Sequence, residues 1–141
     1  MGDNFLREHA VYQIYPISFA DGNGDGKGDL KGVISKLDYL ENLGIKIIWL
    51  SPIYVSPMFD FGYDIEDYYN INPMFGTMED FDLLMEETKK RGIRVVMDLV
   101  VNHTSDHHKW FKAALSNPES AYRDYYVFKK GKKDEKGRQL P

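Results

Sequence analysis

The chain has no cysteine, no long apolar run and no excess of positive charge, and each absence excludes a class of protein. Without cysteine, disulfides and thiolate catalysis are excluded, although no compartment is thereby assigned. No apolar run approaches the roughly 20 residues that a membrane helix needs. The net charge of −4 argues against a nucleic-acid partner or a polybasic membrane surface. The remaining composition, 43% hydrophobic and 28% charged, is that of an ordinary globular protein.

The beginning of the chain, from Met1 to Glu8, is polar and charged, which is not the pattern of a signal peptide. Asn102-His103-Thr104 matches a glycosylation sequon, but without a secretory signal we treat the match as coincidental. We therefore expect a cytoplasmic protein. No pattern in the sequence assigns an oligomeric state.

Three apolar runs predict β-strands, and a helix-like pattern separates each run from the next. The predicted strands are residues 11–16, 45–50 and 93–97, which are rich in β-branched and aromatic side chains. Apolar residues at helical spacing predict a helix over 33–43, with Gly44 as its cap. A second helix is predicted around 81–88 and should end at Gly92.

This order predicts an α/β fold made of repeated strand–helix units. Strands with nearly continuous apolar runs are usually buried on both faces, which favours a parallel sheet covered by helices. Each helix leads into the next strand through a short glycine turn, whereas the loops after the strands are long. The 27-residue loop 51–77 has no recognisable structure of its own, which is uncommon unless a loop is functional.

Polar side chains gather after two of the predicted strands. Asp98, Asn102 and His103 follow the third strand, and Asp60 and Tyr63 lie in the long loop after the second. Ligands bind at the C-terminal ends of parallel strands. A strand-end aspartate is often only a helix cap, but the apolar residues after Asp98 argue against a helix there. Asp60 and Tyr63 also fit a plain turn. Because sugar sites combine carboxylates with aromatic faces, we predict a sugar site.

An acidic, glycine-rich loop covers residues 21–29. Its oxygen-bearing side chains resemble positions 1, 3, 5 and 9 of a calcium loop, with a free carbonyl at position 7. Position 12 is Gly32 instead of a bidentate Glu, and a strand precedes the loop, so an EF-hand is not expected. A glycine-rich turn without an ion is the alternative. We predict a structural Ca²⁺ site, with Mg²⁺ as the other oxygen-preferring ion, formed by Asp21, Asn23, Asp25, Lys27 and Asp29.

The strand–helix pattern changes after His103. A short helix is predicted around 110–115, and no further helix of the repeating kind follows. The lysine-rich stretch 129–138 is most simply a solvated loop. An inserted segment is therefore expected to begin near Thr104, which divides the chain into residues 1–103 and 104–141.

Three segments carry motifs of high specificity. They are VYQIYPISFADGNGDGKGDLKG, WLSPIYVSPMFDFGYDIEDYYNINPMFGT and DLVVNHTSDHHKWF. Together they resemble the start of the α-amylase superfamily, glycoside hydrolase family thirteen, in its oligo-1,6-glucosidase and α-glucosidase branch. The resemblance implies a (β/α)₈ TIM barrel with a domain inserted after the third strand. Residues 1–103 would be the first three βα units of the catalytic barrel, and 104–141 the truncated start of the inserted domain.

The resemblance also implies roles for four side chains in the subsite of the non-reducing glucose. Asp60 and His103 would bind sugar hydroxyls, and Tyr63 would stack under the ring. Asp98 would organise the surroundings of the nucleophile. The loop at 21–29 matches the metal site typical of this branch.

No catalytic carboxylate is expected within the chain. The family is a retaining glycosidase with a carboxylate nucleophile and a second carboxyl as acid and base. In the family these come from the fourth and fifth strands, which would lie beyond Pro141. A complete barrel needs about 250 residues. We therefore expect the chain to be a fragment that is inactive by itself.

The leading functional hypothesis is a hydrolase of carbohydrate metabolism that releases terminal α-linked glucose from short oligosaccharides or disaccharides. Alternatives on the same scaffold are an α-glucosyl isomerase or transglycosylase such as trehalose synthase, and a trehalose-6-phosphate hydrolase. A non-catalytic barrel relative that acts as a transporter partner is a different class. A membrane anchor precedes the barrel in those relatives, whereas ten residues precede the first predicted strand here. A free-standing calcium-binding module would leave a half-built core.

Overall fold

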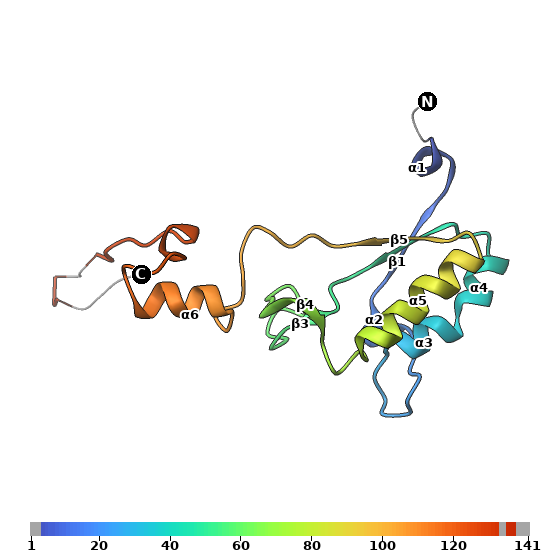
Figure 1. Cartoon of the computed structure of the whole chain (residues 1–141), viewed down its shortest axis with the longest axis horizontal. Coiled ribbons are helices and arrows are strands. Elements are labelled where there is room, and N and C mark those ends of the chain that lie inside the picture. The colour runs from blue at the N-terminus through green and yellow to red at the C-terminus, as the bar shows by residue number, and fades with distance from the viewer. Residues whose placement is uncertain (1–3, 133–134, 138–141) are drawn as a thin grey trace.

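The computed structural model describes residues 4–132 and 135–137, and its elements follow the predicted α/β order (Figure 1). In chain order the elements are α1 (Phe5–Glu8), β1 (Val11–Ile14), α2 (Pro16–Phe19), α3 (Leu30–Ser35), α4 (Leu37–Asn42), β2 (Ile47–Leu50), β3 (Tyr54–Val55), β4 (Asp67–Ile71), α5 (Met78–Lys90), β5 (Arg94–Met97), α6 (Lys109–Ser116) and the 3₁₀ helix η1 (Arg123–Tyr125). The three predicted strands are confirmed as β1, β2 and β5, each slightly shorter than predicted.

These three strands form one parallel sheet with β2 in the centre. Ile14 of β1, Leu50 of β2 and Met97 of β5 lie in register as the last residues of their strands. The residues that follow the three strands therefore leave the sheet along one edge. Asp98 follows β5 directly at this edge.

The helix predicted over 33–43 is two short helices, α3 and α4, which meet at Lys36. The hydroxyl of Ser35 donates to the carbonyl oxygen of Gly32 at 2.7 Å, and such back-bonding bends helices. The two helices nevertheless bury the same apolar face, as shown by Val33 in α3 and Leu37 in α4, which are both fully buried. The prediction of one continuous helix is therefore wrong, while the predicted buried face is correct.

Helix α5 confirms the second predicted helix and extends it toward its N-terminus. Thr77 and Asp80 form a reciprocal capping box, which satisfies main-chain amides at the start of the helix. The turns after α4 and α5 contain Gly44 at φ 83° and Gly92 at φ 63°, left-handed conformations that glycine adopts without steric cost. Both predicted glycine stops are confirmed.

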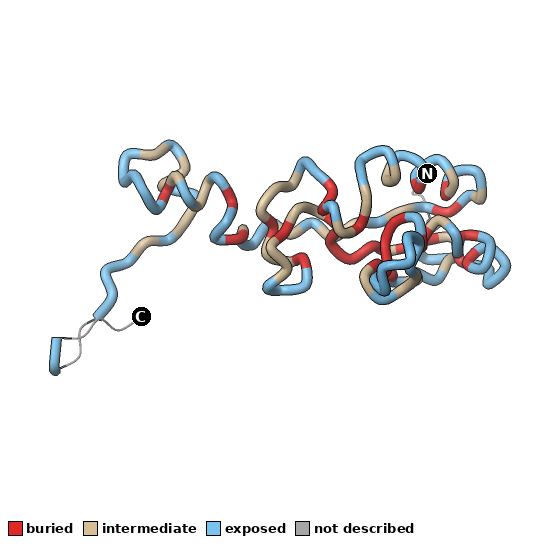
Figure 2. Tube along the Cα trace, turned by 90° about the horizontal axis from the view of Figure 1, so that it is seen from below, coloured by how far each residue is buried: buried red, intermediate tan, exposed pale blue. Residues whose placement is uncertain are grey.

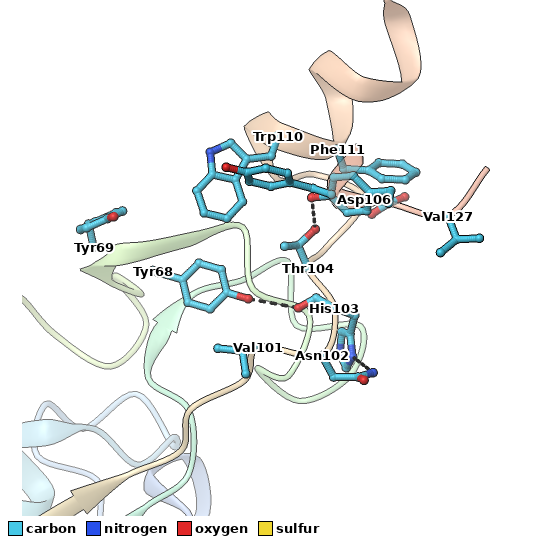
Figure 3. Close-up of a pocket in the computed structure, with 12 residues that line it drawn as sticks. Tyr68, Tyr69, Val101, Asn102, His103, Thr104, Asp106, Trp110, Phe111 and Val127 are labelled. Atoms are coloured by element: carbon cyan, nitrogen blue, oxygen red, sulfur yellow. Dashed lines mark hydrogen bonds between the residues drawn. The ribbon is translucent and has the colours of Figure 1, made fainter. Parts of the chain in front are cut away.

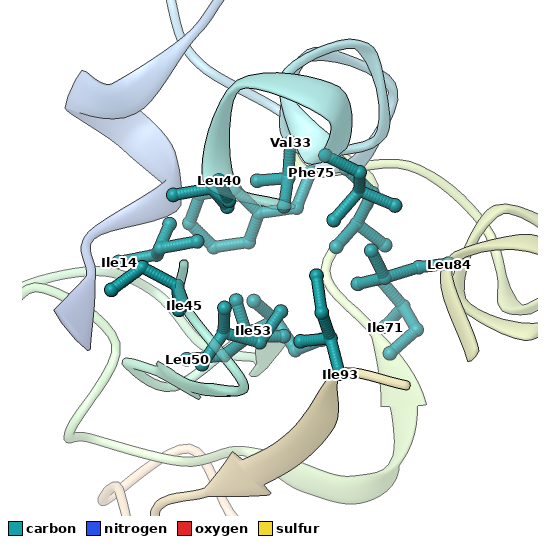
Figure 4. Close-up of a cluster of buried hydrophobic side chains, with 13 residues drawn as sticks. Ile14, Val33, Leu40, Ile45, Leu50, Ile53, Ile71, Phe75, Leu84 and Ile93 are labelled. Atoms are coloured by element: carbon teal, nitrogen blue, oxygen red, sulfur yellow. The ribbon is translucent and has the colours of Figure 1, made fainter. Parts of the chain in front are cut away.

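The hydrophobic core lies between the sheet and the helices α3, α4 and α5 (Figures 1 and 4). Leu40 of α4 and Leu84 of α5 are fully buried with Leu50 of β2 in this cluster. The edge strands are less covered, since Val11 of β1 is 49% exposed and Val96 of β5 is 41% exposed. Burial on both faces is therefore correct for β2 and wrong for β1 and β5. The exposed residues alternate along β1 and β5, so one face of these two strands has no covering layer in the described residues.

The loop 51–77 contains regular structure that the sequence analysis did not predict. Strands β3 and β4 pair antiparallel within it, with an irregular register between Tyr54 and Val55. The prediction of an unstructured loop is therefore wrong. Strand β3 is only two residues long, so its existence depends on pairing with β4 and not on a local apolar pattern.

The segment after Thr104 extends away from the sheet and is mostly exposed (Figures 1 and 2). Helix α6 confirms the short helix predicted around 110–115. Residues 129–132 and 135–137 of the lysine-rich stretch are exposed and lack helix or strand, as predicted, and the rest of that stretch lies outside the described residues. Residues 1–3 of the predicted polar N-terminus and the end of the predicted segment 104–141 also lie outside them. Within the described part of the chain, no helix has the length and apolar character needed to cross a membrane.

Candidate functional site at the ends of the parallel strands

Asp98 is the centre of a hydrogen-bonded cluster at the C-terminal edge of the sheet. One carboxylate oxygen accepts a hydrogen bond from Trp49 Nε1 at 2.7 Å. The other oxygen accepts one from the hydroxyl of Tyr63, also at 2.7 Å. Trp49 lies on the neighbouring strand β2, whereas Tyr63 comes from the long loop. Asp98 therefore joins the sheet to the loop and presents an oriented acceptor.

The environment of Tyr63 keeps its hydroxyl protonated. Burial, the hydrogen bond to Asp98 and the charge of that carboxylate raise the pKa of Tyr63 to about 12. Burial and the Asp98 charge also raise the pKa of Tyr54, whose hydroxyl lies 3.4 Å from the Asp98 carbonyl oxygen. At neutral pH Tyr63 is consequently a hydrogen-bond donor and not a base. Both carboxylate oxygens of Asp98 already accept strong donors, so the arrangement suits positioning better than nucleophilic attack.

His103 reaches the same loop from the other side. Its Nε2 lies 3.1 Å from the main-chain carbonyl oxygen of Tyr63. Because a carbonyl oxygen only accepts, Nε2 carries the proton in this contact. Nδ1 lies 3.5 Å from the Asn102 side-chain amide nitrogen, which can donate to it. The His103 side chain is exposed, although both of its ring nitrogens have a partner in the chain.

Asp60 lies in the turn that leads to Tyr63. Its carbonyl oxygen accepts a hydrogen bond from the Tyr63 amide at 2.9 Å. Its own amide donates to the Asp64 carboxylate at 3.1 Å. The Asp60 side chain is exposed and makes no hydrogen bond to the part of the chain that the structure describes. The four predicted sugar-binding residues therefore lie at the same end of the sheet. Tyr63 forms hydrogen bonds with Asp98 and His103, and Asp60 is joined to Tyr63 by a main-chain hydrogen bond of its turn.

Sequence reasoning missed two residues of this site. The sequence predicts Trp49 only as part of the second strand, although its indole N–H is one of the two donors to Asp98. Asp64 belongs to the second family motif and has no predicted role, although its carboxylate accepts the main-chain amides of Phe59 and Asp60 in the turn. An alternating side-chain pattern could have placed Trp49 on one face of the strand, but not beside Asp98.

The predicted metal loop is folded by hydrogen bonds between its own residues. The Asp21 carboxylate accepts hydrogen bonds from three main-chain amides of the loop at 2.6–3.0 Å. These hydrogen bonds outweigh the weaker effect of burial and lower the pKa of Asp21. Asp29 caps α3 by accepting from the Gly32 amide at 2.7 Å. Within the described residues, no three His, Cys, Asp or Glu side chains are gathered as a metal site.

The donor chemistry of this loop nevertheless fits a hard cation. Asp21, Asn23 and Asp25 supply side-chain oxygens, and Lys27 supplies a main-chain carbonyl. Asp25 and Asn23 accept main-chain hydrogen bonds at 2.8 and 2.9 Å, which orient their oxygens within the loop. Asp29 is 4% exposed and already holds the N-terminus of α3, so it would serve two functions at once.

A cavity of about 650 Å³ opens beside His103 (Figure 3). Its aromatic lining comes from β4, α6 and the segment around η1: Tyr68, Tyr69, Trp110, Phe111, Tyr125 and Tyr126. Tyr68 donates its hydroxyl to the carbonyl oxygens of Val100 at 2.7 Å and of His103 at 3.1 Å. Neither Asp98 nor Tyr63 lines this cavity, so it adjoins the cluster without enclosing it.

Comparison with known proteins assigns the family. The sequence model described as "Alpha amylase, catalytic domain" matches residues 13–141. The chain belongs to the alpha-amylase family. It is similar to the glucan 1,6-alpha-glucosidase of Streptococcus pneumoniae serotype 4, with 60% identity over 92% of this chain and 24% of the relative. It is also similar to the trehalose-6-phosphate hydrolase of Bacillus subtilis, with 59% identity over 88% of this chain and 22% of the relative.

Solved structures of the family show the same fold as this chain. The trehalose-6-phosphate hydrolase of Bacillus licheniformis matches with a TM-score of 0.88 at 55% identity, over 94% of this chain and 24% of that one. The trehalulose synthase from Pseudomonas mesoacidophila MX-45 matches with a TM-score of 0.91 at 51% identity, over 95% of this chain and 24% of that one. The chain thus spans about a quarter of the length of the relatives it matches, and its α/β fold is that of the N-terminal region of an alpha-amylase-type barrel.

Proposed function

We propose that the chain is the N-terminal part of a retaining α-glucosidase that releases terminal α-linked glucose from short oligosaccharides or disaccharides. The observation that carries the proposal is the cluster of Tyr63, Asp98 and His103 at the strand ends of an alpha-amylase family member. Three relatives with 57–60% identity are named for 1,6-linked or trehalose-6-phosphate substrates. A pocket that fixes one terminal glucose would serve all of these substrates.

Each of the four side chains has a role that its surroundings support. The exposed carboxylate of Asp60 is free to bind sugar hydroxyls, and the exposed imidazole of His103 would exchange one of its two present hydrogen bonds for a sugar hydroxyl. The Tyr63 ring offers an apolar face to the sugar while its hydroxyl is held by Asp98. Asp98, which is held by Trp49 and Tyr63, would order the groups that surround the nucleophile.

The nucleophile and the acid/base are proposed to lie outside residues 1–141. A retaining glycosidase needs two carboxyl groups about 5–5.5 Å apart, one to attack and one to transfer a proton. Asp98 is engaged by two donors, and Asp60 is placed as a sugar ligand. We accordingly propose that residues 1–103 are the first three βα units of a (β/α)₈ barrel and that 104–141 begin an inserted domain.

A second candidate function is transfer of the glucosyl unit within the substrate. The similarity to a trehalulose synthase, with a TM-score of 0.91, favours it. Hydrolysis and isomerisation would share the same glucose pocket and differ in whether water or the released sugar attacks the glycosyl intermediate. A cytoplasmic location stays a prediction of the sequence.

One assay separates these activities. The protein expressed from its complete reading frame is incubated with isomaltose, maltose, sucrose and trehalose 6-phosphate, and its products are resolved by chromatography. Release of free glucose with retained anomeric configuration is the expected result. An isomeric disaccharide would identify the transferase, and no turnover of any α-glucoside would overturn the proposal. Turnover of a nitrophenyl α-glucoside by residues 1–141 alone would contradict the placement of the catalytic carboxylates.

We also propose that Asp21, Asn23, Asp25, Asp29 and the Lys27 carbonyl hold one structural Ca²⁺ or Mg²⁺. The ion would neutralise the acidic loop and contribute no chemistry to the reaction. Calorimetric titration of Ca²⁺ into chelator-treated protein should show one binding event. Asp25→Asn should weaken it at least tenfold, because a charged ligand is lost. No binding by the unaltered protein would contradict this proposal.

A further inference from the structure

Asp60 is the predicted sugar ligand that is least supported by other side chains. Tyr63 is held by Asp98 at its hydroxyl and by His103 at its carbonyl. The Asp60 carboxylate has no such partner among the described residues, and only its main chain is fixed. Its amide donates to Asp64 at 3.1 Å. The position of the Asp60 side chain therefore depends on the groups that hold its turn.

The turn around Asp60 adopts a conformation that side chains disfavour. Met58 has φ 65° and Phe61 has φ 50°, both in the left-handed region, and Gly62 follows at φ 97°. A non-glycine residue remains in this region only where its surroundings hold it there. Packing of the aromatic rings does not supply the restraint, since Phe59 is 80% exposed and Phe61 is 64% exposed. Met58 packs against the hydrophobic core, so hydrogen bonds must maintain the part of the turn from Phe59 to Phe61.

Three of these hydrogen bonds converge on Asp64. One of its carboxylate oxygens accepts from the Phe59 amide at 3.0 Å, and the other accepts from the Asp60 amide at 3.1 Å and the Ser56 hydroxyl at 2.8 Å. The Ser56 hydroxyl oxygen in turn accepts from the Met58 amide at 2.9 Å, and Ser56 is buried. Burial acts to raise the pKa of Asp64, but the hydrogen bonds from Ser56, Asp60 and Phe59 outweigh it and lower the pKa. The carboxylate is thus charged when it accepts these donors.

We infer that Asp64 is a positioning residue, whose carboxylate holds the turn 58–62 and thereby places Asp60 against the terminal glucose. The inference rests on the proposed function in one respect, which is that Asp60 binds sugar hydroxyls. Asp64 acts through the main chain of Asp60 and does not itself touch the sugar. A carboxylate is required here, because an asparagine at this position would direct an N–H₂ group toward a main-chain N–H or a hydroxyl donor.

The test compares Asp64→Asn with Asp67→Asn in the protein expressed from its complete reading frame. Asp67 is a matched control on β4, since it also accepts a main-chain amide, from Tyr69 at 2.8 Å, and a side-chain donor, Asn70, at 2.7 Å. Displacement of a substrate-positioning group by about 1 Å can cost 100-fold in rate. With isomaltose as substrate, we expect Asp64→Asn to lower kcat/KM by about 10- to 100-fold, and Asp67→Asn to stay within about twofold of the unaltered protein.

A double-mutant cycle with Asp60→Ala separates positioning from general damage. If Asp64 acts through Asp60, Asp64→Asn should cost less than about threefold in kcat/KM once the Asp60 carboxylate is absent. An equal loss in both backgrounds would overturn the inference, as would an Asp64→Asn protein within twofold of the unaltered one. If Asp64→Asn does not fold, Ser56→Ala removes one of the three donors. It should lower kcat/KM in the same direction, by about threefold, and no change would count against the inference.

Hydrogen exchange distinguishes failure of this inference from failure of the proposed function. If the unaltered protein turns over no α-glucoside, the proposed function fails, but exchange at the Phe59 and Asp60 amides still reports on the turn. These two amides should exchange at least about tenfold faster in Asp64→Asn than in Asp67→Asn, because they lose their acceptor. Equal exchange rates in the two variants would overturn the positioning role whatever the protein catalyses.

Discussion

Replacement of Tyr63 by phenylalanine removes one hydroxyl and keeps the ring, so it isolates the hydrogen bond to Asp98. The bond is 2.7 Å long. Its acceptor is a carboxylate, for which a contribution of about 1.5–3 kcal/mol is usual. Asp98 would keep its second donor, Trp49, and the site is only half-buried, so the lower end of the range applies. We expect Tyr63→Phe to lower the free energy of unfolding by about 1.5 kcal/mol, roughly tenfold in the equilibrium constant.

Urea denaturation of the protein expressed from its complete reading frame, followed by circular dichroism, measures this change. A shifted midpoint with an unchanged slope reports a difference in stability. Tyr69→Phe is the control, since Tyr69 is 74% exposed and its hydroxyl bonds to none of the residues that the structure describes. If the two variants unfold at the same urea concentration, the Tyr63–Asp98 bond does not fasten the loop to the sheet and the reasoning is refuted.

Three further predictions concern pH and packing. Because the pKa of Tyr63 is raised from 10.0 to about 12, its contribution to stability should be complete below pH 10 and lost as the pH rises toward 12. Urea titrations at several pH values should therefore show that the difference in unfolding free energy between the unaltered protein and Tyr63→Phe disappears between pH 10 and 12. Gly32→Ala should destabilise by more than about 3 kcal/mol, seen as a lowered Tm, because its Cβ would lie 1.8 Å from the Ala20 carbonyl oxygen. Leu84→Ala should cost about 2–5 kcal/mol in urea denaturation by opening a cavity in the core, whereas Leu83→Ala, at a 44% exposed position, should cost less than about 0.5 kcal/mol. A Tm for Gly32→Ala equal to that of the unaltered protein, or equal losses for the two leucine variants, would contradict the packing described above.

Much of the strand and helix order could be predicted because its signals are local. Apolar runs marked β1, β2 and β5, and glycine stops marked the ends of α4 and α5. The interruption at Lys36 and the β3–β4 pair could not be predicted in the same way. The first coincides with a hydrogen bond from the Ser35 hydroxyl to the Gly32 carbonyl oxygen, and the second requires pairing between two short segments, neither of which forms an extended apolar run.

The amino-acid sequence by itself determined the family motifs and the α/β order, and it predicted Asp60, Tyr63, Asp98 and His103 as site residues. Only the tertiary structure decided which groups donate hydrogen bonds to Asp98. The two donors, Trp49 and Tyr63, lie 49 and 35 residues earlier in the chain. It likewise decided that Asp64 holds the turn of Asp60. Periodicity reports how one segment is buried, whereas a hydrogen bond between distant segments requires the register of the sheet and the path of the loop, which no local pattern contains.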